Sequence, residues 1–120
     1  MRTSILAAIA TRLSGYHYGY MRYQGKRPSI YWVGEYSTSS HAFESGHDRD
    51  EFILTGTSEG TLKALETEKE AIVKLLDNYR YTDKTGGFVV NYTRALNIPT
   101  ETENVKRLEL HFEIDSFMET

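Results

Sequence analysis

KRLELHFEID, residues 106–115, is the stretch of this sequence with the clearest structural pattern. Its apolar residues are Leu108, Leu110, Phe112 and Ile114, and every residue between them is charged or histidine. Successive side chains of a β-strand point to opposite faces of the sheet, so this alternation predicts a strand with one face in the core and one face wet. Such a strand belongs to an antiparallel sheet whose second face is exposed or meets a charged partner.

Three segments upstream are also predicted to be strands. SIYWVGEY, residues 29–36, combines β-branched and aromatic residues directly after Pro28, which suits the start of a strand. EFILTGT (51–57) and FVVNY (88–92) have the same enrichment in strand-forming residues. The tyrosine-rich segment 16–23 alternates imperfectly, and it is predicted to be a short strand or an extended loop.

Two helices are predicted, at about residues 4–14 and 59–79. In the first, apolar residues recur at helical spacing until Gly15 ends the pattern. In the second, Ser58 is a candidate N-cap, and Glu59 lies where the helix dipole favours an acidic side chain. The apolar stripes of the two helices are Ile5, Leu6, Ile9 and Leu13, and Leu62, Leu65, Ile72, Leu76 and Tyr79.

These elements predict an α+β fold: a four-stranded, mainly antiparallel sheet with two helices packed on one face. A chain of 120 residues is expected to form a single domain over residues 1–120. The residues expected in its core are Ile9, Leu13, Ile30, Leu65, Ile72, Leu76, Val90, Leu108, Leu110 and Phe112.

The composition excludes several kinds of site. Cysteine is absent, which rules out disulfides, thiolate zinc sites, iron–sulfur clusters and a cysteine nucleophile. Hydrophobic residues make up 39%, which is enough for a core and too many for a disordered chain. No apolar run approaches the ~20 residues that span a bilayer, and the apolar stretch 5–10 is too short for a signal peptide. We therefore expect a soluble protein without membrane contact.

Charge is divided unevenly along the chain, whose net charge is −3. Residues 1–34 contain five basic and no acidic side chains, whereas residues 35–120 contain nine basic and 17 acidic ones. The basic third is consistent with a nucleic-acid surface, with a subunit face that meets an acidic face of a neighbour, or with solvated charges that bind nothing.

Candidate catalytic and metal-binding motifs are weak. The long polar connection between the strands near residues 36 and 51 contains His41, Glu44 and His47, but their spacing does not match the helical histidine pair of zinc proteases. The segment 56–60 opens a helix after a strand, yet it lacks the Gly-Lys-Ser/Thr ending of a phosphate loop. No serine lies in a nucleophile elbow. We predict that the protein is not an enzyme and holds no metal or cofactor.

An alternative function rests on the aromatic segment Tyr16–Tyr23. Its four tyrosines are interleaved with His17 and Arg22, and this mixture is typical of proteins that stack single-stranded nucleic acid on aromatic rings. A half-buried aromatic strand has the same composition. The acidic remainder of the chain also disfavours a strong attraction for nucleic acid.

The order of these segments resembles the tail-terminator and minor-tail-protein families of long-tailed, siphovirus-like phages and prophages. The likeness covers about residues 3–117 and rests on RPSIYWVGEYS, the long loop, DEFILTGTS, the helix with ALETEKEAIVKLLD, GGFVVNYTRALNIP and KRLELHFEIDSF. The positions that match the proline-led strand of the family are Pro28, Ile30, Val33, Gly34 and Ser37. The sequence departs from the family in its tyrosine-rich N-terminal stretch and at Gly56, where a bulkier strand residue is expected.

The resemblance implies a tail terminator, a hexameric ring that caps the tail tube and joins it to the head-completion (neck) proteins, with DNA passing through its lumen without specific binding. It implies a virion protein at the head-proximal end of the tail, assembled in the host cytoplasm. A neighbouring neck protein of similar fold fits the same pattern. The basic N-terminal segment, the long loop and the wet face of the last strand supply the candidate subunit and partner contacts: Arg12, Tyr18, Arg22, Lys26, Arg27, Ser40, His41, Phe43, Glu44, His47, Asp48, Glu109, His111 and Glu113.

Overall fold

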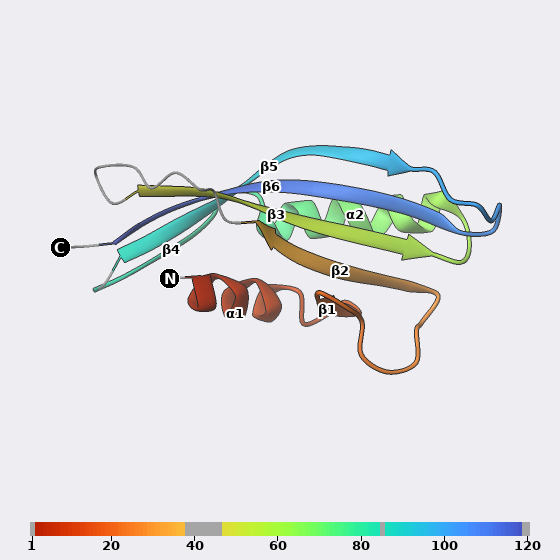
Figure 1. Cartoon of the computed structure of the whole chain (residues 1–120), viewed down its shortest axis with the longest axis horizontal. Coiled ribbons are helices and arrows are strands. Elements are labelled where there is room, and N and C mark those ends of the chain that lie inside the picture. The colour runs from red at the N-terminus through yellow and green to blue at the C-terminus, as the bar shows by residue number, and fades with distance from the viewer. Residues whose placement is uncertain (1, 38–46, 85, 119–120) are drawn as a thin grey trace.

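The computed structural model describes residues 2–37, 47–84 and 86–118. Over these residues the chain forms one six-stranded sheet and two helices (Figure 1). In chain order the elements are α1 (Arg2–Arg12), β1 (Tyr18–Tyr20), β2 (Ile30–Ser37), β3 (His47–Ser58), α2 (Leu62–Leu76), β4 (Tyr79–Asp83), β5 (Gly86–Ile98) and β6 (Lys106–Met118). Their order across the sheet is β1-β2-β3-β6-β5-β4.

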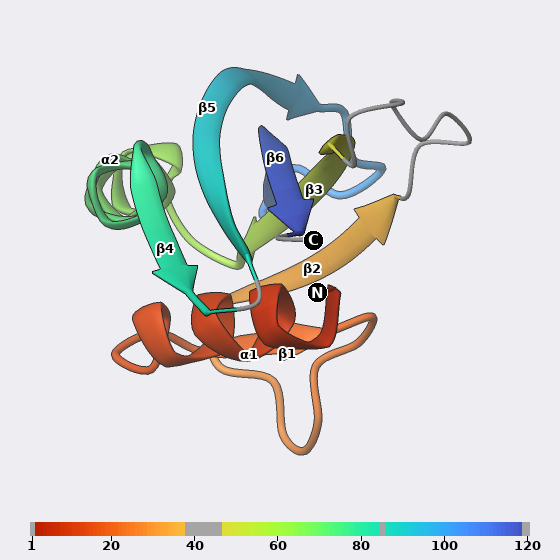
Figure 2. The same ribbon diagram turned by 90° about the vertical axis from the view of Figure 1, so that its left-hand side faces the viewer.

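The sheet is mixed and curled. β1 runs parallel to β2, whereas the other neighbouring pairs of the described strands are antiparallel. Seen from its end in Figure 2, the sheet bends round as a half-barrel instead of lying flat. The right-handed twist of long strands produces such curvature, and a bulge between Tyr92 and Arg94 adds a local bend to β5.

The predicted four-stranded, mainly antiparallel sheet is therefore wrong. The two additional strands, β1 and β4, lie at the edges of the sheet. β1 lies within segment 16–23, where a short strand or an extended loop was predicted. Only three residues of β1 pair with β2, which is too few to produce a clear alternation in the sequence. β4 begins at Tyr79, a residue that continues the helical spacing of the apolar stripe in α2, so the pattern extends the helix into the strand.

Local backbone geometry explains why α2 is shorter than the predicted helix 59–79. Its N-cap is Thr61, whose hydroxyl accepts a hydrogen bond from the backbone N–H of Ala64 at 3.2 Å. At the other end Asp77 is extended and Asn78 has a φ of 62°, in the left-handed region. These two residues stop the helix and turn the chain into β4.

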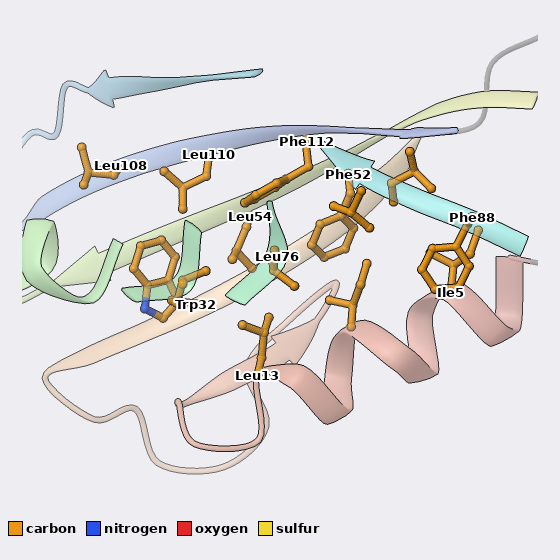
Figure 3. Close-up of a cluster of buried hydrophobic side chains, with 14 of the residues drawn as sticks. Ile5, Leu13, Trp32, Phe52, Leu54, Leu76, Phe88, Leu108, Leu110 and Phe112 are labelled. Atoms are coloured by element: carbon orange, nitrogen blue, oxygen red, sulfur yellow. The ribbon is translucent and has the colours of Figure 1, made fainter. Parts of the chain in front are cut away.

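One hydrophobic core joins both helices to the sheet (Figure 3). At its centre Phe52 of β3 and Phe112 of β6 are register partners, with ring centroids 6.5 Å apart. The core prediction is confirmed at Ile9, Leu13, Leu65, Ile72, Leu76, Val90, Leu108, Leu110 and Phe112, which are all buried. Ile30 is only half-buried, because it is the first residue of β2 and lies at the border of the core.

The buried indole of Trp32 explains the glycine at position 56. Gly56 is the register partner of Trp32 on β3, and a Cβ at Gly56 would lie 2.4 Å from the Trp32 ring. The indole N–H donates to Glu68 Oε1 of α2 at 3.1 Å, which holds the ring in place. Gly56 is therefore present because the Trp32 ring occupies the space that a side chain would need.

Leu110→Ala tests the core. Leu110 is 0% exposed, so we expect the free energy of unfolding to fall by about 2–4 kcal/mol through lost burial and a residual cavity. Leu96→Ala is the matched control; Leu96 is 41% exposed on β5, and its loss should be about 0.5 kcal/mol. Urea unfolding followed by circular dichroism measures both changes, and equal losses would contradict the placement of Leu110.

Gly56→Ala tests the contact with Trp32. The added methyl group overpacks the core, so we expect the free energy of unfolding to fall by about 1–3 kcal/mol. Gly60→Ala is the control, because the only atom within 4 Å of its Cβ is Ser58 Oγ at 3.6 Å. When Trp32→Leu is combined with Gly56→Ala, the free energy of unfolding of the double variant should fall by less than the sum of the two single decreases. Additive losses would show that the ring and the glycine are not coupled.

Candidate functional site

The central strands have one polar face, which lies on the side of the sheet opposite the helices and the core. We call it the outer face; on β3 and β6 it consists of the odd-numbered residues 49–57 and 107–115. The strand register places Glu109, His111 and Glu113 beside Thr55, Ile53 and Glu51, respectively. Three of the predicted contact residues thus share one surface, and they do so because the chain alternates between core and outer face along β6.

Four carboxylates follow one another along this face, and we call them the acidic cluster: Glu51, Glu109, Glu113 and Asp115. Two of them, Glu51 and Glu109, contact His111. His111 Nε2 lies 2.6 Å from Glu109 Oε1, and its Nδ1 lies 3.6 Å from Glu51 Oε1. His111 is only 5% exposed, and no described residue forms a hydrogen bond with its Nδ1. Glu51 and Glu113 are register partners, so two like charges lie directly opposite one another.

Two arginines offset part of this negative charge. Arg49 Nε lies 2.5 Å from Glu113 Oε1 and 2.9 Å from Asp115 Oδ1. The hydrogen bond to Asp115, followed by the charges of both carboxylates, raises the pKa of the Arg49 guanidinium. Arg94 of β5 is the register partner of His111. Four carboxylates against two arginines leave the cluster with an excess of negative charge.

A second charged surface is the loop between β1 and β2, residues 21–29, which we call the basic loop. It projects from the body of the molecule in both Figure 1 and Figure 2. Arg22, Lys26 and Arg27 are exposed, and among the described residues no ion pair joins them to a carboxylate. The Arg27 guanidinium lies over the Tyr31 ring, 5.6 Å from its centroid.

A shallow depression of about 290 Å³ continues from the basic loop onto the outer face. Its lining includes Arg22, Arg27 and Arg107, with Glu35 as its single acidic residue. Arg107 pairs with Thr57 near the end of β3, whereas Glu51 and Arg49 lie near its start. The outer face is therefore basic at one end and acidic at the other.

The other predicted contact residues lie elsewhere. Arg12 ends α1 with its guanidinium 4.2 Å from the centroid of the Tyr79 ring, so it packs within the chain. Ser40, His41, Phe43 and Glu44 lie outside the described residues. His47 and Asp48 open β3, where they pair with Phe117 and Ser116. The basic N-terminal third of the sequence is thus divided between α1 and the basic loop.

The tyrosines of segment 16–23 mostly pack within the fold. Tyr16 and Tyr18 lie against the core, and the ring centroid of Tyr23 is 5.5 Å from that of Tyr31. Tyr20 is 40% exposed. Burial, and to a lesser extent the neighbouring Tyr20, raises the pKa of Tyr18 to about 12. The four rings therefore do not form an open row on which bases could stack.

The described part of the chain shows neither a metal-binding cluster nor a helix that could span a membrane. There, no group of three or more His, Cys, Asp or Glu side chains is arranged to hold a metal ion. His41 and Glu44 of the weak metal motif lie outside this part. Neither α1 nor α2 has the length and apolar character to cross a membrane.

Sequence reasoning did not identify Arg49, Glu51 and Arg94 as neighbours of His111. Arg49 lies in a segment that was predicted to be loop, because β3 begins earlier than its apolar residues indicate. Arg94 reaches the row of His111 because the bulge in β5 shifts the register by one residue. The only sequence signal was alternation itself, which assigns a residue to a face without naming its neighbours.

Comparison with known proteins identifies relatives of the fold. No family model and no curated protein matches the sequence. A chain from the virion of a native gene transfer agent (GTA) particle superposes with a TM-score of 0.72 and 16% identity, over 92% of this chain and 85% of that chain. Another solved chain has a TM-score of 0.71 and 16% identity, over 100% of this chain and 98% of that chain. At these identities the likeness establishes a shared fold.

Titration of Tyr18 tests its burial. We expect one tyrosine to ionise near pH 12 in the folded protein, about two units above an ordinary tyrosine, in a spectrophotometric titration near 295 nm. The unfolded chain releases this proton near pH 10, so Tyr18 lowers stability progressively between about pH 10 and pH 12. Tyr18→Phe should remove that phase and flatten this part of the stability profile, and Tyr92→Phe on β5 is the control. A Tyr18 that titrates near pH 10 would contradict its burial.

Proposed function

We propose that this protein is a non-enzymatic structural component of a phage-like particle and that it acts as a tail terminator. Six copies form a ring that caps the tail tube at its head-proximal end, stops its growth and joins it to the head-completion (neck) proteins. DNA passes through the lumen of the ring without specific binding. The protein is assembled into the virion in the host cytoplasm.

The shared fold is the observation that carries this proposal. The similar chain comes from a GTA virion, and the likeness covers 92% of the present chain. The order of helices and strands that underlies the resemblance to tail terminators is retained, with β1 and β4 added at the sheet edges. One fold serves many functions, so the proposal also needs support from the surface of this chain.

The charged surfaces supply that support. The acidic cluster and the basic loop carry opposite charge and belong to different parts of the molecule. Two unlike surfaces that attract each other favour head-to-tail contacts between copies, and head-to-tail contacts either close into a ring or continue as a filament. A protein that ends a tube needs the closed form.

Binding of single-stranded nucleic acid is the competing function. The packing of Tyr16 and Tyr18 against the core disfavours it, because a stacking surface needs exposed rings. Fluorescence anisotropy with labelled oligonucleotides separates the two functions. Tight binding that is lost in Tyr20→Ala with Arg22→Ala would favour the nucleic-acid function.

Cryo-electron microscopy of tail tubes mixed with the protein tests the proposal. We expect a six-fold ring at one end of each tube and no further growth when tube protein is added. Tubes without the protein, which should continue to grow, are the control. Coating along the tube wall, binding to the opposite end, or a ring that leaves growth unchanged would each contradict a terminator.

A further inference from the structure

We propose that the basic loop of one copy binds the acidic cluster on the outer face of the next copy. This inference rests on the proposed function, because it names the contact that joins neighbouring copies in the ring. The occupant of the acidic cluster is thus a second copy of this chain, and the groups that enter the cluster are the side chains of Arg22, Lys26 and Arg27.

His111 has one ring nitrogen without a hydrogen-bond partner among the described residues. Its Nε2 is 2.6 Å from Glu109 Oε1 and donates to that carboxylate. Its Nδ1 is buried and lies 3.6 Å from Glu51 Oε1. The exposed carboxylate of Glu51 attracts an ammonium or a guanidinium. The chemistry of the cluster therefore favours a lysine or an arginine.

The opposed glutamates favour the same kind of ligand. Glu51 and Glu113 face each other across β3 and β6, and like charges in that position repel. Arg49 binds Glu113 and Asp115, whereas no described lysine or arginine forms an ion pair with Glu51, which lies 3.6 Å from His111 Nδ1. The Glu51 side chain is 49% exposed, so an incoming cation can reach it from solvent.

The basic loop has the matching properties. It carries three exposed cations within residues 21–29 and contains no acidic residue. Met21 and Gly25 have φ values of 68° and 86°, so the loop bends sharply at both positions. Its projection from the body leaves it accessible to another molecule (Figure 1).

The loop and the cluster lie too far apart to meet within one chain. The loop enters β2 beside the end of β3, where Tyr31 pairs with Thr57. Glu51 lies six residues earlier on β3, which corresponds to about 20 Å along the strand. The attraction therefore acts between copies, through two different surfaces, as a closed ring requires.

Charge-reversal variants test this contact by sedimentation velocity. Lys26→Glu with Arg27→Glu reverses the net charge of the loop, and Glu51→Lys reverses the charge at the exposed position 51 of the cluster. We expect wild-type self-association at about 50 mM salt to weaken at about 500 mM. Each variant should lower the association constant at least about tenfold, because like charges then meet. Two control variants carry the same charge changes on the exposed side of α2. The double variant Lys63→Glu with Lys74→Glu matches the loop variant, and Glu70→Lys matches Glu51→Lys. Both controls should associate as the wild type does.

Mixing the two variants gives the sharper result. The reversed loop of one variant carries glutamates that can pair with Lys at position 51 of the other, and the two native surfaces also fit each other. An equimolar mixture should therefore recover the association that each variant lost. Circular dichroism melting confirms that both variants are folded, and Glu51→Gln replaces Glu51→Lys if the latter is not. With Glu51→Gln, the readout is a smaller loss of association.

Several outcomes would overturn the contact. The wild type could stay monomeric up to about 1 mM at low salt. The loop and cluster variants could associate as strongly as the wild type, or their equimolar mixture could fail to recover the lost association. A six-fold ring on tubes that persists with the reversed loop would reject this contact and retain the terminator function. Recovery in the mixture without any ring on tubes would retain the contact and reject the function.

Discussion

The antiparallel pairing of β3 with β6 is the constraint on which the rest of the structure depends. Twelve residues of β3 pair with twelve of β6, and this register sets Phe52 against Phe112 and Leu54 against Leu110. The helices α1 and α2 pack on the apolar surface that these pairs form. A slip of one residue would exchange the core and outer faces, so burial of the apolar side chains strongly specifies the register.

The same register creates the charge arrangement of the outer face. Burying one Leu or Phe contributes about 1.5–3 kcal/mol, whereas a cross-strand pair of charges contributes about 0.2–1 kcal/mol. Core burial therefore outweighs the repulsion between Glu51 and Glu113, and the fold retains an excess of negative charge that it does not neutralise itself. A surface of this kind is suited to contact with the basic part of another molecule.

Sequence patterns predicted the elements whose burial is periodic and failed where the chain turns. The core face predicted for β6 is confirmed, because Leu108, Leu110, Phe112 and Ile114 are buried, whereas His111 on the predicted wet face is buried as well. β4 was not predicted, because Tyr79 continues the helical spacing of α2 and only the left-handed conformation of Asn78 separates the two elements. Gly56 likewise had no explanation until its strand partner was known to be Trp32.

The sequence by itself determined which side chains of the regular elements face the core and which lie on the opposite face, because the strand and helix periods are local properties. It placed Glu109, His111 and Glu113 on one strand face, and it placed Arg22, Lys26 and Arg27 within six residues of one another. Only the tertiary structure decided that Glu51 lies beside His111 and that the cations lie far from both. Residues 51 and 111 belong to separate segments of the chain, and their contact is set by strand register, which no local period encodes.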